Sequence, residues 1–411
     1  MYQWLILKRR LEDVIIFPFA LLGRWIARFR PLKEEYDIFF FFPFYHVGGA
    51  EKVHSEIVKL FPEKKIVVFF TKKSMNEAML PQFRAPNITI HNISAYTDNK
   101  WLYFLNLIWR GIAAGYVHRQ RHAPVVFNGQ CNFAYKLSPH LRPGVRQIEL
   151  IHSFCSFSYI RLPFLPFFTA TVMISRDSIA QHLALYKRYK VPAQFEERIR
   201  LIMNGIQLPE RGGSAGEGFT AGPGREIRHR HGQGAYARPP LSLLYVGRGT
   251  EEKRPWLVAE IAKASNLPAG FLGPVEAAVP AELRPYGHFY GEQTDAAAID
   301  AIYRQHRVIM ITSTREGFPM VIMEAMARGL AVLATDVGDI PYHVKNGENG
   351  FLLDHTQQEA GIVRQAVQCL ARWQQQPEQL QAIAEANIRY AREHFGMEAF
   401  AQAYRSLLLE L

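Results

Sequence analysis

Two glutamates in the second half of the chain, Glu316 and Glu324, are spaced so that both could bind the hydroxyl groups of a sugar. Pro319 suits the first turn of a helix, because it lacks an N–H and its fixed φ angle is already helical. Glu316 is then expected in the loop before that helix and Glu324 within it. A carboxylate on so apolar a helix is costly unless hydrogen-bond donors reach it, and sugar hydroxyls are such donors. Taken alone, the pair fits equally well one capping glutamate and one glutamate exposed to water.

The turn formed by Gly317, Phe318 and Pro319 predicts an anion site. The first backbone N–H groups of a helix have no partner and lie at the positive end of its dipole, which favours a phosphate or sugar oxygen. Arg248 and Lys253 add two cations suited to a diphosphate, because Arg forks onto two oxygens and Lys acts as a point charge. The alternative for these two cations is an exposed turn with solvated charges.

Apolar runs bounded by turn residues predict the strands that position these side chains. Such runs are typical of parallel strands buried on both faces, whose carboxyl ends form the ligand-binding edge of the sheet. Gly48 and Gly49 follow the first run, and His152 ends the fifth, although a lone histidine at a strand end is more often structural. The runs in the first half are 37–44, 65–71, 88–93, 124–129, 147–151 and 171–175, and 241–248 opens a second unit.

The run from His288 to Pro341 resembles the donor half of family 4 of the retaining glycosyltransferases, enzymes of the two-domain GT-B fold. The resemblance implies that Glu316 contacts the hydroxyls of the donor sugar and that Glu324 binds the ribose of the nucleotide. It also implies that Arg248 and Lys253 bind the diphosphate. Gly317, Phe318 and Pro319 would then form part of the donor site.

The first half of the chain also resembles this family. The resemblance implies that Gly48 and Gly49 lie near the donor phosphates and that His152 is the active-site histidine, placed near the donor sugar. Several positions depart from the family pattern, among them Tyr342 in place of a common glutamate. Arg254 stands where relatives usually have a glycine after the lysine, and Asp339 stands where relatives often have a second glycine.

Residues 1–34 predict a basic, amphipathic helical extension. The longest apolar run, Val14–Gly23, is too short to span a bilayer and contains Pro18. An interfacial helix or helix pair is expected, with aromatic residues on apolar faces and basic residues near lipid head groups. The alternative is a helix docked on the protein's own surface. The aromatic residues are Trp4, Phe17, Phe19 and Trp25, and the basic ones are Lys8, Arg9, Arg10, Arg24, Arg28 and Arg30.

Charge and cysteine content limit the partners and the compartment. The 411 residues carry a net charge of +11, and Asp98 is the only acidic residue between Met79 and Ile148. Such a basic region suits an anionic membrane or a phosphorylated substrate, and the absence of nucleic-acid-binding motifs argues against nucleic acid. Three widely spaced cysteines form neither a disulfide framework nor a metal site, so a cytoplasmic location is expected, at the inner face of the membrane.

The predicted fold class is α/β, with two Rossmann-like domains facing a cleft. Residues 35–206 are expected to form the acceptor domain and residues 241–390 the donor domain. A Gly/Arg/Pro-rich insertion, 207–240, is expected to be flexible, and residues 391–411 are expected to form a helix that crosses back to the first domain.

The function implied is transfer of a hexose, with retention, from a nucleotide-diphosphate sugar to a glycan or lipid-linked acceptor in cell-surface polysaccharide or lipopolysaccharide biosynthesis. The sequence lacks an Asp-x-Asp pair for a divalent metal, so transfer without a metal or another cofactor is expected. Two alternatives stay open. One is a non-catalytic, membrane-associated protein that binds a nucleotide sugar, and the other is an epimerase or phosphorylase of the same fold.

Overall fold

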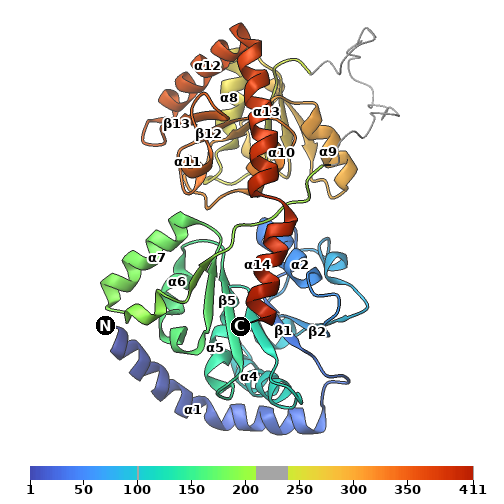
Figure 1. Ribbon diagram of the computed structural model, residues 1–411, viewed down its shortest axis with the longest axis vertical. Coiled ribbons are helices and arrows are strands. Elements are labelled where there is room, and N and C mark those ends of the chain that lie inside the picture. Colours follow the sequence, from blue (N-terminus) through green and yellow to red (C-terminus); the bar gives the residue numbers. More distant parts are fainter. Residues whose placement is uncertain (100, 210–238, 411) are drawn as a thin grey trace.

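A computed structural model describes residues 1–99, 101–209 and 239–410 of the chain. It contains two Rossmann-like domains, one above the other in Figure 1, so the predicted α/β class with two such domains is confirmed. Most of the predicted insertion, residues 210–238, lies outside the described residues.

The N-terminal domain is built on a seven-stranded parallel sheet in the order β3-β2-β1-β4-β5-β6-β7. Successive side chains of the central strand β1 point to opposite faces, so Phe40 and Phe42 pack towards α2 and α14 while Phe39 and Phe41 pack towards α4 and α5. The strands are β1 (Ile38–Phe42), β2 (Ile66–Phe70), β3 (Ile88–Asn92), β4 (Val125–Asn128), β5 (Arg146–Ile151), β6 (Ala170–Met173) and β7 (Ile199–Leu201). The helices are α1 (Tyr2–Phe29), α2 (Gly49–Lys59), α3 (Ser94–Thr97), α4 (Tyr103–His118), α5 (Asn132–Leu137), α6 (Ser156–Ile160) and α7 (Arg176–Tyr189).

The C-terminal domain has a six-stranded parallel sheet in the order β10-β9-β8-β11-β12-β13. Helices α8 and α12 cover one face and α9 and α10 the other, while α13 contributes buried residues to both cores. The strands are β8 (Leu243–Val246), β9 (Ala269–Leu272), β10 (Gly287–Gly291), β11 (Val308–Ile311), β12 (Ala331–Thr335) and β13 (Gly350–Leu353). The helices are α8 (Pro255–Ser265), α9 (Ala296–Arg304), α10 (Met320–Ala327), α11 (Ile340–His343), α12 (Glu359–Gln375) and α13 (Pro377–His394).

The last helix, α14 (Met397–Leu409), leaves the C-terminal domain and lies on the N-terminal one (Figure 1). Its buried residues Phe400 and Tyr404 join the core beneath β1 and α2. Arg146 donates to the carbonyl oxygen of Leu407 over 2.7 Å. The crossing helix begins at Met397 rather than at residue 391.

Helix α1 is one continuous helix, so the expectation of a helix pair is not needed. It crosses α4 where two glycines remove the side chains that would separate the backbones. A Cβ on Gly23 would overlap the carbonyl oxygen of Ile108, and one on Gly111 would overlap that of Ala20. Pro18 is tolerated because it lies on the exposed face, away from this crossing. Within the described ranges, no helix combines the length and apolar character that crossing a bilayer requires.

The α1–α4 crossing predicts opposite effects for two glycine-to-alanine substitutions. Alanine in a helix is favoured over glycine by up to about 1 kcal/mol, but at Gly111 its Cβ forces α1 away and overpacking costs about 1–3 kcal/mol. We expect Gly111→Ala to lower the free energy of unfolding and to speed hydrogen exchange in α1. In Gly361→Ala, the matched control in α12, the nearest atom to the new Cβ is the Cβ of Gln357 at 3.1 Å, so stability should hold or rise. Unchanged protection of α1 in Gly111→Ala would contradict the close crossing.

Candidate functional site

The carboxyl ends of the two sheets meet at the junction between the domains. Lys52, in the first turns of α2, forms a 2.5 Å ion pair with Glu324 of α10. Asp339, which follows β12, accepts hydrogen bonds of 2.6 Å from the backbone N–H groups of Arg176 and Asp177. A carboxylate of one domain thus caps helix α7 of the other. These contacts hold the residues that follow β1, β5, β8 and β11 around one junction.

Glu316 lies in the loop after β11, as predicted, and hydrogen bonds reach only one of its two carboxylate oxygens within the described residues. Oε1 accepts hydrogen bonds from Lys253 Nζ at 2.7 Å and from Ser313 Oγ at 2.6 Å. Oε2 accepts no hydrogen bond from any residue in the part of the chain described. The fixed oxygen therefore orients the carboxylate, and the other oxygen is left for a ligand.

The turn after Glu316 brings its backbone next to the N-terminal domain. The position that a Cβ would take on Gly317 lies 3.4 Å from the carbonyl oxygen of His152. Gly338, in the turn after β12, has a φ of +58°, and a Cβ there would overlap the carbonyl oxygen of Glu316, so this close approach requires glycine. The Glu316 turn is thus fixed between β12 and the histidine.

Phe318 and Pro319 contribute differently from what the sequence indicates. The Phe318 side chain is 4% exposed and packs 4.1 Å from the His343 ring, so only its backbone is left to face a donor. Pro319 is in an extended conformation, with φ −73° and ψ 131°, and α10 begins at Met320. The prediction that Pro319 lies in the first turn is therefore wrong by one residue. Its carbonyl oxygen instead accepts the first helical hydrogen bond, from Ile322.

Glu324 lies within α10, as predicted, and both of its oxygens have partners. Oε1 pairs with Lys52, and Oε2 accepts from the Tyr303 hydroxyl at 2.9 Å. Burial and the neighbouring Glu324 carboxylate raise the pKa of Tyr303 well above its usual range, so the hydroxyl keeps its proton. Lys52 is about half exposed. A ribose at Glu324 would therefore displace Lys52 more easily than the buried Tyr303.

Arg248 and Lys253 lie on the turn that joins β8 to α8. Arg254 adopts a left-handed conformation, with φ 47°, which is the backbone geometry that glycine tolerates best. Its guanidinium offsets the strain by donating to the carbonyl oxygen of Thr312 over 2.7 Å, while the Thr312 hydroxyl donates to the Arg254 carbonyl over 2.9 Å. These two hydrogen bonds thus hold Arg254 in a backbone conformation that favours glycine. The Arg248 side chain is exposed and forms no ion pair within the described ranges.

Gly48 and Gly49 lie at the start of α2, on the N-terminal side of the junction. Gly48 is the N-cap in an extended conformation, and a Cβ on Gly49 would meet no atom within 4 Å. Glu51 in the same turn is buried, and its burial raises the pKa of its carboxyl group. His46 Nε2 lies 3.8 Å from this carboxylate. The first turn of α2 is thus open at Gly49 and acidic at Glu51.

His152 follows β5 directly and pairs with a second histidine. Its Nε2 lies 2.9 Å from Nε2 of His54, on α2, and its backbone N–H donates to Gln130 Oε1 over 3.1 Å. Burial lowers the pKa of His152 to about 4 and that of His54 well below its usual range. Both rings are therefore neutral at neutral pH.

The partners of the predicted residues have little or no signal in the sequence. Lys52 and His54 had one available signal, because both follow Gly48 and Gly49 within the helix expected there. Tyr303 and Ser313 carried none, since nothing in the local pattern links them to a carboxylate. Gln130, in the turn after β4, lies where ligand-binding residues of such sheets occur but resembles an ordinary loop residue.

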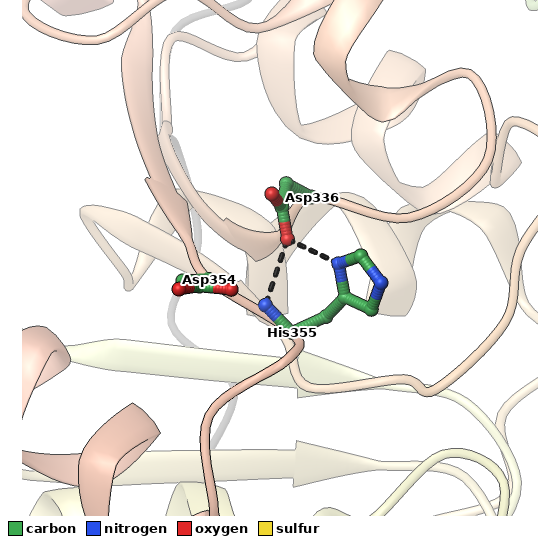
Figure 2. Close-up of side chains that lie close together, drawn as sticks. All are labelled: Asp336, Asp354 and His355. Carbon is green, nitrogen blue, oxygen red and sulfur yellow. Dashed lines mark hydrogen bonds and ion pairs between the residues drawn. The ribbon is translucent and has the colours of Figure 1, made fainter.

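Asp336, Asp354 and His355 lie close together after β12 and β13 (Figure 2). Asp336 accepts from the His355 backbone N–H at 2.8 Å and shares a 2.6 Å contact with His355 Nδ1, as the dashed lines show. Asp354 accepts from the Thr356 hydroxyl over 2.6 Å. These hydrogen bonds hold the two turns and account for the grouping without a ligand.

The cap that Asp339 places on α7 predicts a role in domain orientation. In Asp339→Ala the N–H groups of Arg176 and Asp177 lose their partner, and loss of such a cap costs about 0.5–2 kcal/mol. Because Ser175 still caps α7 from within the helix's own domain, we expect the domains to separate rather than α7 to unfold. Small-angle scattering should show a larger radius of gyration than wild type. Asp336→Ala, on the same connection but paired with His355, is the control, and equal radii in all three proteins would contradict the role.

Comparison with known proteins relates the chain to one family. Residues 235–372 match the family model "Glycosyl transferases group 1". The chain is 27% identical over 224 residues to the lipopolysaccharide core biosynthesis mannosyltransferase LpcC of Rhizobium leguminosarum bv. viciae, covering 51% of this chain and 60% of that protein. It is 29% identical over 163 residues to a D-inositol 3-phosphate glycosyltransferase of Rhodococcus erythropolis, covering 39% of this chain and 31% of that one.

Solved structures share the two-domain fold over nearly the whole chain. Anabaena HepE in complex with UDP and glucose has a TM-score of 0.68 at 17% identity and covers 92% of this chain and 100% of its own. The apo lipopolysaccharide outer core galactosyltransferase WaaB has a TM-score of 0.62 at 16% identity, covering 91% and 99%. Residues 235–372, the stretch that matches this family model, include the arginine, the lysine and both glutamates of the candidate site.

Proposed function

We propose that this protein transfers a hexose, with retention of configuration, from a nucleotide-diphosphate sugar to a glycan or lipid-linked acceptor. One observation carries the proposal. Two cations after β8 and two carboxylates around the start of α10 meet a neutral His152 where the carboxyl ends of the sheets converge. The names of two relatives, one a lipopolysaccharide core mannosyltransferase and the other a structure with UDP and glucose, support a glycan acceptor and a nucleotide-sugar donor.

The residues around α10 have two roles in the transfer, stabilising the leaving diphosphate and orienting the sugar. The bond from the anomeric carbon to the diphosphate breaks, and the acceptor oxygen bonds on the same face, its proton passing to the departing diphosphate. Arg248, Lys253 and the backbone N–H groups of Gly317 and Phe318, which donate to no residue in the described part of the chain, stabilise the negative charge that develops there. These positive groups take the place of a divalent metal, for which the sequence offers no Asp-x-Asp pair. Glu316 and His152 orient the sugar.

Nucleotide binding tests the donor site. We expect one of UDP, GDP or ADP to raise the melting temperature without added metal and Glu324→Ala to weaken its binding about tenfold to a hundredfold, since a charge-assisted hydrogen bond contributes about 1.5–3 kcal/mol. Lys52→Ala should bind at least as tightly as wild type, because it removes the side chain that competes for Glu324. Glu385→Ala, on the exposed face of α13, is the control.

The same experiment separates the competing functions. No melting shift with any nucleotide would contradict the donor site. A shift without product on any acceptor would indicate a binding protein, and NMR of the anomeric proton in a product would distinguish retention from inversion. Activity abolished by EDTA and restored by a divalent cation would contradict metal independence.

We further propose that the protein works at the cytoplasmic face of an anionic membrane, through the outer face of α1. The inner face carries small or paired residues, including Ala20, Gly23 and Ala27, that pack on α4, whereas the outer face carries large apolar ones. A contiguous exposed apolar face of this kind marks a site of interaction with a membrane or a protein. Its exposed residues, each at least 37% accessible, are Met1, Trp4, Leu7, Leu11, Val14, Ile15, Phe17, Phe19, Leu21, Leu22, Trp25 and Phe29.

Charge around this face supports a lipid rather than a protein partner. Lys8, Arg10, Arg28 and Arg30 are exposed beside the apolar stripe, where they suit lipid phosphates. Arg9 instead turns inward to pair with Glu12 at 3.0 Å, which differs from its predicted place near head groups. Trp101, 95% exposed just before α4, extends the apolar surface of the same domain.

Vesicle binding tests the outer face of α1. Trp4 and Trp25 are about 60% exposed, so Trp4→Glu/Trp25→Glu should fold normally and bind anionic vesicles at least tenfold more weakly, because each buried aromatic contributes about 1.5–3 kcal/mol. Tyr286→Glu/Tyr342→Glu, at two exposed positions of the other domain, is the charge-matched control. Equal sedimentation of wild type and the double variant would contradict the proposal. Dimerisation without lipid that the double variant abolishes would assign the face to a second copy.

A further inference from the structure

We propose that His54 is a positioning residue for the transfer, and that it holds His152 in the tautomer whose proton is on Nδ1. The inference rests on the proposed function for its role, and on geometry alone for the tautomer. His54 lies on α2, is 1% exposed, and among the described residues its side chain hydrogen-bonds to His152 alone. Nothing in the family resemblance or in the relatives' names assigns it a part.

The two imidazole rings share a single proton between their facing nitrogens. The Nε2 atoms are 2.9 Å apart, a hydrogen-bond distance, so one nitrogen donates and the other accepts. Burial keeps both rings neutral, and a second proton would place two positive charges side by side in a buried site. A neutral imidazole carries one N–H, so the donor of this bond determines where the other ring holds its proton.

The surroundings of His54 decide which ring donates. Its Nδ1 is buried and has no hydrogen-bond partner. If His152 donated, His54 would have to carry its proton on this Nδ1, leaving a buried N–H without an acceptor, a rare and costly arrangement. If His54 donates through Nε2, its Nδ1 keeps only a lone pair. His152 then accepts on Nε2 and carries its proton on Nδ1.

The His54 ring cannot turn away from this bond. It stacks on Phe42 with centroids 4.1 Å apart and an interplanar angle of 15°. Beside this stack, a Cβ on Gly129 would lie only 2.7 Å from both His54 Nε2 and Phe42 Cε1, so the backbone after β4 closes on the two rings. The backbone of His152 is fixed as well, by its hydrogen bond to Gln130.

The consequence is a neutral hydrogen-bond donor of fixed direction at the end of β5. His152 is half-buried, and its Nδ1 makes no hydrogen bond to any residue that the structure describes. An uncharged N–H suits a sugar hydroxyl, whereas the diphosphate charges match Arg248 and Lys253. With the free oxygen of Glu316 as acceptor nearby, the junction presents one donor and one acceptor to the sugar.

Nitrogen-15 NMR of the histidine rings tests the tautomer directly, without any substrate. In wild type we expect His152 Nδ1 to resonate as a protonated nitrogen and Nε2 as an unprotonated one. His54→Gln keeps an N–H donor near the same place and should preserve this pattern. His54→Leu fills the site without a donor and should move His152 towards the Nε2–H tautomer. His140→Leu, at another buried histidine of the domain, is the control and should leave His152 unchanged.

Kinetics test the role. We expect His54→Leu to lower kcat at least tenfold with little change in the KM for the donor, and His54→Gln to restore most of the activity. A His152 proton on Nε2 in wild type, or an identical ring spectrum in His54→Leu, would overturn the tautomer assignment. An altered tautomer with unchanged kcat would overturn the positioning role. Because the spectrum is read without a donor, failure of sugar transfer itself would leave the tautomer result standing and would be recognised separately.

Discussion

The candidate site depends on two parallel sheets meeting carboxyl end to carboxyl end. Each sheet alone offers half of a site, with His152 and the open turn at Gly49 on one side and the cations and carboxylates on the other. Two contacts across the junction set their relative position, one between a carboxylate and backbone N–H groups and the other between two charged side chains. Asp339 caps α7, and Lys52 pairs with Glu324. Helix α14 adds a covalent constraint, because it continues from α13 and packs in the core of the other domain.

The strands and the donor turn were predictable because local pattern alone determines them. Strand β1 is a run of five fully buried phenylalanine and isoleucine residues, which only a sheet covered on both faces accommodates. Gly338 has a φ of +58° that glycine adopts without strain. Glu316 and Glu324 were located correctly relative to α10, although the helix starts one residue later than expected, since Pro319 caps it.

The partners of these residues were not predictable, for a physical reason. His54 and His152 are 98 residues apart, and Lys52 and Glu324 are 272 apart. Such pairs form only when helices pack and domains dock. The hydrophobic periodicity of the sequence predicts single helices and strands, but not these contacts between distant residues. Arg254 shows the same limit, because its left-handed conformation is held by Thr312 of a distant strand end. For α1, the sequence predicted an amphipathic helix. It did not indicate which face of that helix would pack against α4 and which would stay exposed.

If Glu324 binds the ribose as proposed, the ion pair between Lys52 and Glu324 competes with the substrate for this carboxylate. The lysine is about half exposed, and ion pairs of that kind are typically worth about 0–1 kcal/mol, so the pair would lower the affinity of the ribose by less than tenfold. The lysine would then return to the carboxylate when the spent nucleotide dissociates. A weak internal counter-ion of this kind would shorten the residence time of the leaving product, and so favour turnover over tight binding.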